Sequence, residues 1–345
     1  MNLTIHKFFF VFLLFSNWAC MKKKTYPLSE RYDGKRFYND SPIEERGLSD
    51  LFKWWWQGGK KTWPTEVTNE AEPELPSGEV DPTKLYVTYV NHASFLIQMS
   101  GLNILTDPIY SERASPISWA GPKRARKPGI EFDKLPRIDY VFISHNHYDH
   151  LDLPTIKRLF EKFNPEFIVP LGNVELLRTE GDLKILELDW WQNAPLARGA
   201  SITLVPSQHW SARGIFDRSH ALWGGFIISQ NTWKVHFQGD TGHGPFFKKI
   251  QKAFPEIDLS ILPIGAYEPR WFMKGHHMNP EDAVLAHLDL KSHHSLASHF
   301  ETFQLTDEAI GDPRLALAES LKQHGIAEDI FQALKTGQTR MYLKN

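Results

Sequence analysis

Four side chains of the types that bind metal ions stand within six consecutive residues of this sequence. They are His145, His147, Asp149 and His150, and they directly follow the apolar run 140–144, which is predicted to be a buried strand. Two imidazoles at positions i and i+2 of a strand end can point the same way, so His145 and His147 can share one ion. Asp149 and His150 can face a second ion beside the first. Burying such polar groups together without a metal is costly, so the cluster indicates a metal site.

The composition limits both the class of protein and the kind of metal site. The chain has 345 residues, with 39 Lys and Arg against 41 Asp and Glu, and this balance argues against a nucleic-acid partner. Hydrophobic residues make up 41% of the chain, which is enough for a large core. The sequence has 16 histidines and a single cysteine, so any metal cluster must be built from His and Asp side chains.

The N-terminus is typical of an export signal. Lys7 precedes the apolar run 8–15, which is shorter than a membrane span, and small Ala19 stands before Cys20. We therefore expect residues 1–20 to form a signal and lipoprotein segment, with the mature protein lipid-anchored through Cys20 in a bacterial cell envelope, periplasmic or at the outer membrane. An ordinary cleaved signal, or a tethering segment with an incidental cysteine, is the alternative.

Residues 21–84 are predicted to form a linker that wraps the surface of the main domain, because a Pro- and Glu-rich stretch at 64–82 breaks regular structure. Within this segment Trp54-Trp55-Trp56 either docks into the domain or lies at a lipid headgroup interface. Residues 85–345 are then one domain.

Short strand-like runs alternate with helical segments beyond residue 85, as in α/β and α+β proteins. Strands are predicted at 85–90, 94–99 and 103–106, and Ser100-Gly101 joins the last two as a hairpin.

The motif His-x-His-x-Asp-His at 145–150 resembles that of the metallo-β-lactamase superfamily. The family pattern also asks for a later His, an Asp and a last His at strand ends, and His209, Asp240 and His299 stand in that order. The resemblance implies an α+β fold, the αββα sandwich of two mixed β-sheets flanked by helices, in a single catalytic domain.

The resemblance also implies a ligand set for two ions. The first ion would be held by His145, His147 and His209, the second by Asp149, His150 and His299, and Asp240 would bridge them. Zinc is the expected metal, with iron or manganese as alternatives that an all-His/Asp site accepts. Such a pair of ions activates a bridging water as hydroxide and stabilises the attacked group.

Longer segments resemble the N-acyl-phosphatidylethanolamine-hydrolysing phospholipase D family and its bacterial outer-membrane-associated relatives. The segments are 91–94, 105–109, 113–116, 121–124, 143–151, 208–210 and 263–273. The resemblance implies a phosphodiesterase of phospholipase D type, with a phospholipid or other phosphodiester as substrate and a membrane surface as partner. It leaves the oligomeric state open, a homodimer included.

Further roles follow from the same resemblance. Asp107 is expected to accept the free N–H of a ligand histidine. Catalytic roles fall to Asp149 and to His277 at the mouth of the site, where His277 binds the phosphoryl group or protonates the leaving alkoxide. Arg270 pairs either with the phosphate or in a structural salt bridge. His276 has no counterpart in the pattern and is expected to be exposed to solvent.

The sequence departs from the family at the last ligand. His299 is commonly followed there by Trp-Gly-Thr-Phe, whereas this chain has Phe300-Glu301-Thr302-Phe303. Glu301 is therefore predicted to place a carboxylate near the site, which would restrict a bulky anionic phospholipid.

Two other functions stay open at this point. The di-metal chemistry also suits a lactonase or another metallo-hydrolase that acts on a small soluble substrate, because the fold alone does not fix the substrate. A non-catalytic envelope protein that binds metal or lipid is the other alternative, although the complete ligand set favours an enzyme.

Overall fold

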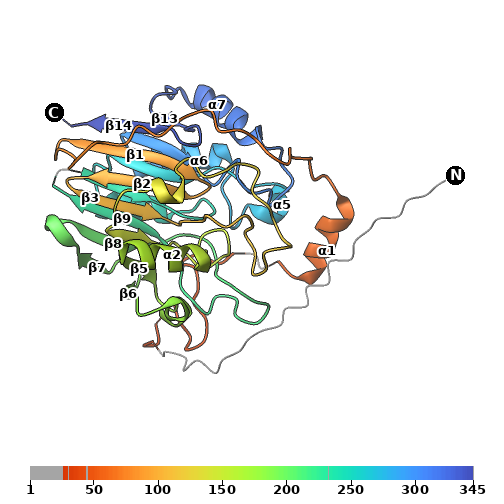
Figure 1. Cartoon of the computed structure of the whole chain (residues 1–345). Coiled ribbons are helices and arrows are strands. Elements are labelled where there is room, and N and C mark those ends of the chain that lie inside the picture. The colour runs from red at the N-terminus through yellow and green to blue at the C-terminus, as the bar shows by residue number, and fades with distance from the viewer. Residues whose placement is uncertain (1–25, 30, 44–45, 232, 345) are drawn as a thin grey trace.

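The computed structural model describes residues 26–29, 31–43, 46–231 and 233–344, in which two seven-stranded sheets pack face to face (Figure 1). The first sheet has the order β14-β1-β2-β3-β4-β5-β6 and the second the order β13-β12-β11-β10-β9-β8-β7. The strands of the first sheet are β1 Lys84–Asn91, β2 Ser94–Met99, β3 Leu102–Thr106, β4 Tyr140–Phe142, β5 Glu166–Pro170, β6 Lys184–Leu188 and β14 Thr339–Leu343. Those of the second are β7 Asn193–Pro195, β8 Ser201–Val205, β9 Gly225–Gln230, β10 Trp233–Phe237, β11 Leu259–Pro263, β12 His294–Ser298 and β13 Phe331–Gln332.

Both sheets are mixed. Strands β14, β1, β2 and β3 are antiparallel neighbours, and β3 to β6 are parallel. In the second sheet β7 to β10 are antiparallel and β10 to β13 are parallel. The predicted strands at 85–90, 94–99 and 103–106, and the hairpin between the last two, are confirmed. The predicted sandwich of two mixed sheets is confirmed as well.

Helices cover the outer faces of the sandwich. Seven α-helices are described: α1 Leu48–Gln57, α2 Leu153–Phe163, α3 Val174–Leu177, α4 Phe246–Ala253, α5 Arg270–Met273, α6 Pro280–Leu290 and α7 Asp312–His324. Three short 3₁₀ turns complete the described elements: η1 Phe132–Lys134, η2 Arg178–Glu180 and η3 Ala197–Gly199. Helix α2 lies on the side of the first sheet, and α6 and α7 lie together on the side of the second (Figure 1).

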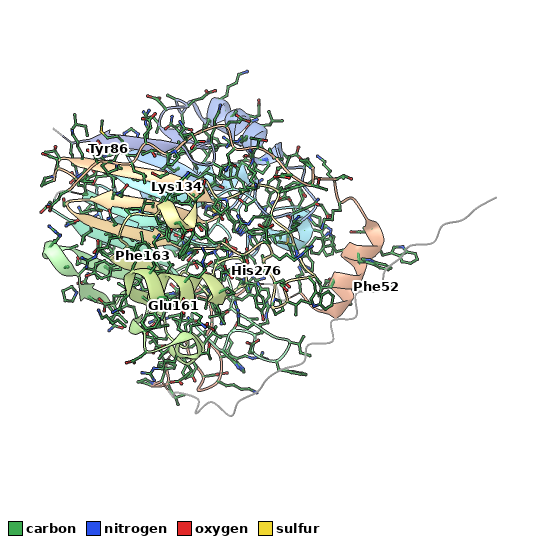
Figure 2. The ribbon with its side chains drawn as sticks, viewed as in Figure 1. Phe52, Tyr86, Lys134, Glu161, Phe163 and His276 are labelled. Carbon is green, nitrogen blue, oxygen red and sulfur yellow. The ribbon has the colours of Figure 1, made fainter. Side chains whose placement is uncertain are left out.

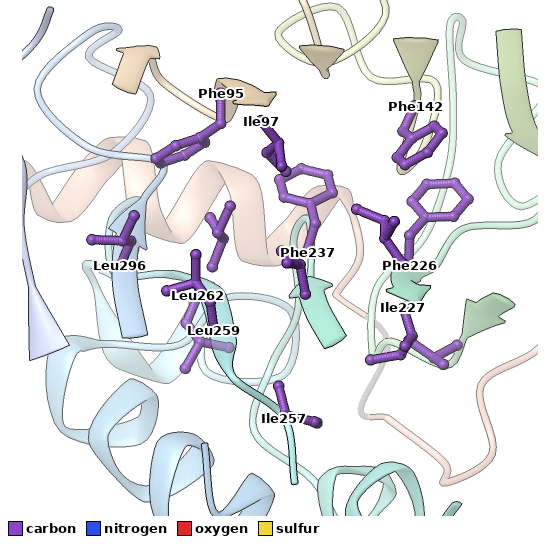
Figure 3. Close-up of a cluster of buried hydrophobic side chains, with 14 of the residues drawn as sticks. Phe95, Ile97, Phe142, Phe226, Ile227, Phe237, Ile257, Leu259, Leu262 and Leu296 are labelled. Carbon is purple, nitrogen blue, oxygen red and sulfur yellow. The ribbon is translucent and has the colours of Figure 1, made fainter. Parts of the chain in front are cut away.

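The main core fills the space between the two sheets. Figure 3 shows Phe95 and Phe142 of the first sheet facing Phe226 and Phe237 of the second, and all four side chains are fully buried. A second apolar cluster lies under α2, where Ile156 packs on the outer face of the first sheet. Because alternate side chains of the central strands point into these two layers, the sheets form a rigid frame for the loops at their ends.

The His and Asp residues predicted as metal ligands all follow strand ends. Strand β4 precedes the 145–150 motif, β8 precedes His209, β10 precedes Asp240 and β12 precedes His299. The frame thus brings loops far apart in the chain to one edge of the sandwich.

The described parts of this segment, 26–29, 31–43 and 46–83, lie along the outside of the domain and contain α1 (Figure 1). The three tryptophans of the triplet 54–56 differ in their surroundings. Trp54 docks, since its ring lies 5.0 Å from that of Phe272 and its Nε1 donates to Asp307 at 2.7 Å. Trp55 and Trp56 are 64% and 75% exposed.

None of the helices in the described part of the chain is both long and apolar enough to cross a bilayer. The predicted signal segment 1–20, with Cys20, lies outside the described residues.

Candidate metal centre

Three histidine nitrogens converge at the edge of the sandwich. Nδ1 of His147 lies 2.9 Å from Nε2 of His145 and 3.2 Å from Nε2 of His209. Ligand nitrogens around a tetrahedral zinc ion, with Zn–N bonds of about 2.0–2.1 Å, lie about 3.3 Å apart. The structure therefore brings together the three residues predicted for the first ion, at a spacing that suits a shared cation.

Hydrogen bonds to Nδ1 determine that His145 and His209 each direct Nε2 toward His147. Nδ1 of His209 lies 3.0 Å from the carbonyl oxygen of His276, which can only accept, so Nδ1 carries the proton. Nδ1 of His145 lies 2.9 Å from Oγ of Ser144, which itself donates to Asp107 at 2.6 Å. Both arrangements leave an Nε2 lone pair facing His147.

The residues predicted for the second ion meet beside the first group. Oδ2 of Asp149 lies 3.3 Å from Nε2 of His150 and 3.2 Å from Nε2 of His299. Oδ2 of Asp240 lies 3.2 Å from each of the same two nitrogens. It also lies 3.8 Å from Nε2 of His209, so Asp240 stands between the two groups.

The Asp107 carboxylate accepts hydrogen bonds that hold residues of both groups in place. Its Oδ2 lies 2.6 Å from Nδ1 of His150, and its Oδ1 accepts the backbone N–H of Ser144 at 2.7 Å. The side chain is fully buried, and its φ of 33° places it in the left-handed region that non-glycine residues rarely adopt. The geometry is that expected of a carboxylate that orients a ligand histidine and sets its tautomer.

His92 is part of this cluster, although no role was predicted for it from the sequence. Its Nε2 lies 2.9 Å from Oδ2 of Asp149, and its carbonyl accepts the N–H of His299 at 2.8 Å. His92 and His299 both have left-handed backbone, with φ of 47° and 62°. Strain of this kind concentrates at functional sites. The available signal was the segment 91–94, which carried the family resemblance without an assigned residue.

The electrostatics differ between the two groups. Burial lowers the pKa of His147 to about 4 and holds the pKa values of His145 and His209 well below the usual range, and neighbouring histidines add to the effect on the latter two. These rings are neutral at pH 7 and can offer lone pairs.

In the second group the attraction between opposite charges has a larger effect on the pKa values than burial has. Burial alone would lower the pKa of His299, but the carboxylates of Asp240 and Asp149 outweigh it and raise that pKa to about 9. The pKa of His150 is likewise raised, since Asp240 and Asp149 outweigh burial. Burial opposes ionisation of Asp149 and Asp240, yet the adjacent histidines hold both pKa values well below the usual range.

His277 lies at the same cluster, with its Nδ1 3.8 Å from Oδ2 of Asp240. Burial lowers its pKa to about 4, so the ring is neutral at pH 7. Arg270 donates to the His277 carbonyl at 3.0 Å and pairs with Asp282 at 2.5 Å. Of the two interpretations of Arg270, the structure shows the salt bridge, and the guanidinium holds the His277 backbone.

The expectation that His276 is exposed is wrong. Its side chain is half-buried, its ring lies 6.0 Å from that of His209, and its Nδ1 is buried without a hydrogen-bond partner among the described residues. It turns inward because its carbonyl accepts the His209 Nδ1–H. Met278, two residues further on, is fully buried and leads into α6, which begins at Pro280 with Asn279 as N-cap.

The structure shows which groups the Glu301 carboxylate pairs with. It lies 2.5 Å from Nε of Arg314 and 3.5 Å from a guanidinium nitrogen of Arg126. It is not part of the clusters of metal-ligand side chains among the described residues. The backbone φ of 56° lies in the left-handed region, which a glycine adopts without strain. The predicted effect of Glu301 on the substrate stays a prediction.

One buried atom of the cluster tests whether a metal fits. Oδ1 of Asp240 has no hydrogen-bond partner among the described residues. Buried polar atoms are rarely left unpaired, so this oxygen needs a ligand that the described residues do not supply. Imidazole and carboxylate donors at this spacing suit a divalent cation.

A cavity of about 570 Å³ lies away from this centre, between residues 58–61 and the start of α7. It is lined in part by Tyr267 and Glu268, just before α5, and none of the His and Asp residues of the metal centre is among its lining residues. The cavity is therefore not the site of the metal chemistry.

The comparisons with known proteins agree with this geometry. A family model for the beta-lactamase superfamily domain matches residues 102–300. N-acyl-phosphatidylethanolamine-hydrolyzing phospholipase D 1 of Caenorhabditis elegans is 38% identical over 247 residues, which cover 68% of this chain and 69% of the nematode protein. The chain belongs to the metallo-β-lactamase superfamily and to its N-acyl-phosphatidylethanolamine-hydrolysing phospholipase D-like family.

Other matches support this family. The mitochondrial N-acyl-phosphatidylethanolamine-hydrolyzing phospholipase D of Saccharomyces cerevisiae is 31% identical over 264 residues, 75% of this chain and 56% of the yeast protein. Igni18, a metallo hydrolase from Ignicoccus hospitalis, covers 76% of this chain and 100% of its own with a TM-score of 0.58 and 21% identity, which shows the common fold. As a phospholipase D-like member of the superfamily, the chain is a metal-dependent hydrolase.

Proposed function

We propose that this chain is a binuclear zinc phosphodiesterase of phospholipase D type that hydrolyses N-acyl-phosphatidylethanolamine or a related phospholipid. The observation that carries the proposal is the position of Asp240, whose Oδ2 lies within 4.0 Å of His145, His150, His209 and His299. One carboxylate between two sets of ligand-type side chains suits a pair of cations. The two relatives named for this hydrolysis supply the substrate class.

In the proposed centre one ion is held by His145, His147 and His209, the other by Asp149, His150 and His299, and Asp240 is shared. Such cations supply Lewis-acid activation of water and of the phosphoryl group when they are bound. Zinc is proposed over iron and manganese, and metal analysis of the purified protein decides among the three.

The chain's own residues are arranged for the remaining steps. Hydrolysis forms a bond from a water oxygen to phosphorus and breaks the bond from phosphorus to the alcohol oxygen, with one water proton ending on that alcohol. The carboxylate of Asp149 is 13% exposed, so it can face the attacking water and orient it. Neutral His277 is placed to donate a hydrogen bond to a phosphoryl oxygen, because its lowered pKa leaves it a poor acid for the leaving group at pH 7.

A lipid substrate requires access from a membrane, and we propose that an exposed apolar surface beside the centre provides it. We call this the aromatic surface: Leu51, Phe52, Trp55 and Trp56 of α1, and Ile215 and Phe216. Figure 2 shows Phe52 on the side of α1 turned away from the sheets. The loop that carries Ile215 and Phe216 begins near Trp210, whose ring packs 4.4 Å from that of His147. Exposed tryptophan and phenylalanine are typical of interfacial contact with lipid.

The cellular location is part of the proposal. The apolar run 8–15 and Cys20 precede the described residues, and acylation of Cys20 would anchor the protein to a bilayer of the cell envelope. Such an anchor would keep the aromatic surface close to lipid.

The test uses the purified full chain saturated with zinc and vesicles of phosphatidylcholine containing N-acyl-phosphatidylethanolamine, in H₂¹⁸O. We expect N-acylethanolamine without the label and phosphatidic acid with one ¹⁸O, because the water oxygen joins phosphorus. An Asp240→Asn variant should release neither product. No cleavage of this lipid or of any other phosphodiester by the metal-loaded protein would refute the proposed reaction, and hydrolysis of lactones instead would favour the alternative.

A further inference from the structure

The side chain of Asn39 makes a two-point contact with the backbone of His209, across 170 residues of sequence. Nδ2 of Asn39 donates to the His209 carbonyl at 2.9 Å, and Oδ1 accepts the His209 N–H at 3.0 Å. The amide is itself held, because Nε1 of Trp223 donates to the same Oδ1 at 3.1 Å. The segment predicted to be a linker therefore reaches a residue of the metal centre.

The same segment also holds the loop that orients the His209 ring. The His209 Nδ1–H donates to the His276 carbonyl, so the position of residues 271–276 sets the direction of the ring. Arg46 donates to the Trp271 carbonyl at 2.7 Å. The side chain of Ile43 packs so close to Gly275 that a Cβ on this glycine would meet it at 2.6 Å.

These contacts bear on metal affinity because His209 itself lies outside the strands. It lies four residues beyond the end of β8, in the long loop 206–224. A ligand must be held within about 0.5 Å of its productive position to bind a metal well. Two hydrogen bonds on the peptide groups and one on the ring Nδ1 restrict His209 from both sides.

We propose that Asn39 is a positioning residue for the metal centre, and that Asn39, Ile43 and Arg46 together act as a clamp on His209. This inference rests on the proposed binding of a cation by His145, His147 and His209. It assigns to the N-terminal segment a function in retaining that cation, and it predicts that the two cations differ in their dependence on this segment.

The experiment is a Zn²⁺ titration of the metal-free full chain in competition with a chromophoric chelator, for wild type and Asn39→Ala. We expect the variant to bind the ion held by His145, His147 and His209 about 10–100-fold more weakly, as for other groups that orient a ligand. It should bind the other ion as wild type does. Asn69→Ala is the matched control, since Asn69 lies in the same segment and donates to the exposed backbone carbonyl of Lys127 at 3.0 Å.

An isosteric variant guards against a folding defect. Asn39→Asp keeps an acceptor for the His209 N–H and loses the donor to the His209 carbonyl, so it should weaken the same ion by a smaller factor. Cobalt(II) spectra of the weakened site should also change in both variants, because the His209 ligand moves.

The outcomes separate this inference from the proposed function. If wild type binds no metal, the proposed function fails. If wild type binds two ions and both Asn39 variants bind them equally well, the clamp is wrong even when the metal-free variants melt at lower temperature, because that loss would be structural only.

Discussion

Nδ1 of His150 lies 2.6 Å from Oδ2 of Asp107, and both side chains are fully buried. Asp107 thereby fixes the His150 ring so that Nε2 faces Asp149 and Asp240. The amide side chain of an Asp107→Asn variant could not accept from both His150 and Ser144 as the carboxylate does. We predict that the Asp107→Asn protein binds the ion held by Asp149, His150 and His299 about 10–100-fold more weakly than wild type, as measured by chelator competition.

The control for this variant is Asp133→Asn, a change at an exposed aspartate on η1. It should bind both ions as wild type does. Equal affinity in the Asp107→Asn protein would mean that the buried pair is structural and that His150 needs no fixed tautomer.

Metal binding should release protons unequally. In the metal-free protein the pKa of His299 is raised to about 9 and that of His150 is also raised, so both rings are in the cationic, doubly protonated form at pH 7. The rings of His145, His147 and His209 are neutral at this pH. The ion held by Asp149, His150 and His299 must therefore displace protons, whereas the ion held by His145, His147 and His209 need not. We predict that the affinity for the ion held by Asp149, His150 and His299 rises with pH, about tenfold per unit for each proton released, and that the contribution of His299 ends near pH 9.

Calorimetric titrations with Zn²⁺ at pH 7, in buffers of different ionisation enthalpy, measure this release. At pH 9.5, above the pKa of about 9 of His299, this ring should no longer contribute most of its proton to the release. Equal proton release for both ions at pH 7 would contradict the assignment of charges.

Glu301 compensates two largely buried guanidinium groups, those of Arg314 and Arg126. A Glu301→Gln variant leaves both without a counter-charge, and we predict a loss of about 3 kcal/mol in the free energy of unfolding. Urea denaturation followed by tryptophan fluorescence measures this loss. The double variant Glu301→Leu with Arg314→Met should recover part of it, and a loss under about 0.5 kcal/mol in Glu301→Gln would show that the pair adds nothing, as exposed pairs often do.

The aromatic surface should govern binding to lipid and leave the chemistry intact. We predict that changing Trp55 and Trp56 together to serine weakens binding to phosphatidylcholine vesicles at least tenfold, with little dependence on salt. Hydrolysis of a short-chain, water-soluble phosphodiester should stay within about twofold of wild type. Leu315→Ser is the control, because Leu315 is 72% exposed on α7 outside this surface.

Sedimentation with vesicles gives the binding constants, and sedimentation velocity without lipid shows whether these residues join two copies of the chain instead. Unchanged vesicle binding in the double variant would exclude α1 as a lipid contact.

The sequence was sufficient for much of the centre because a strand predicted from its apolar pattern precedes the 145–150 motif, and the family resemblance implied that the other ligands stand at strand ends. The motif at 145–150 is dense, and His209, Asp240 and His299 each lie just past a buried strand. Asp107 stands just past β3, where a carboxylate reaches the adjacent β4 loop. For these residues local pattern and tertiary position agree.

Other features depend on contacts with no local signal. Asn39 lies in a polar stretch, and nothing near it indicates a partner 170 residues away. His92 joins Asp149 only because β1 and β2 turn back beside the motif. Glu301 carries no local signal for its ion-pair partners, because Arg126 and Arg314 come from two other segments of the chain.

The central claim is that this chain binds two cations through one connected set of side chains. Anomalous X-ray diffraction from crystals of the zinc-saturated full chain, recorded on both sides of the zinc absorption edge, tests it most directly. We predict two peaks per chain, one bound by His145, His147 and His209, the other by Asp149, His150 and His299, with Asp240 between them. A single peak, no peak, or peaks at other side chains would contradict the account.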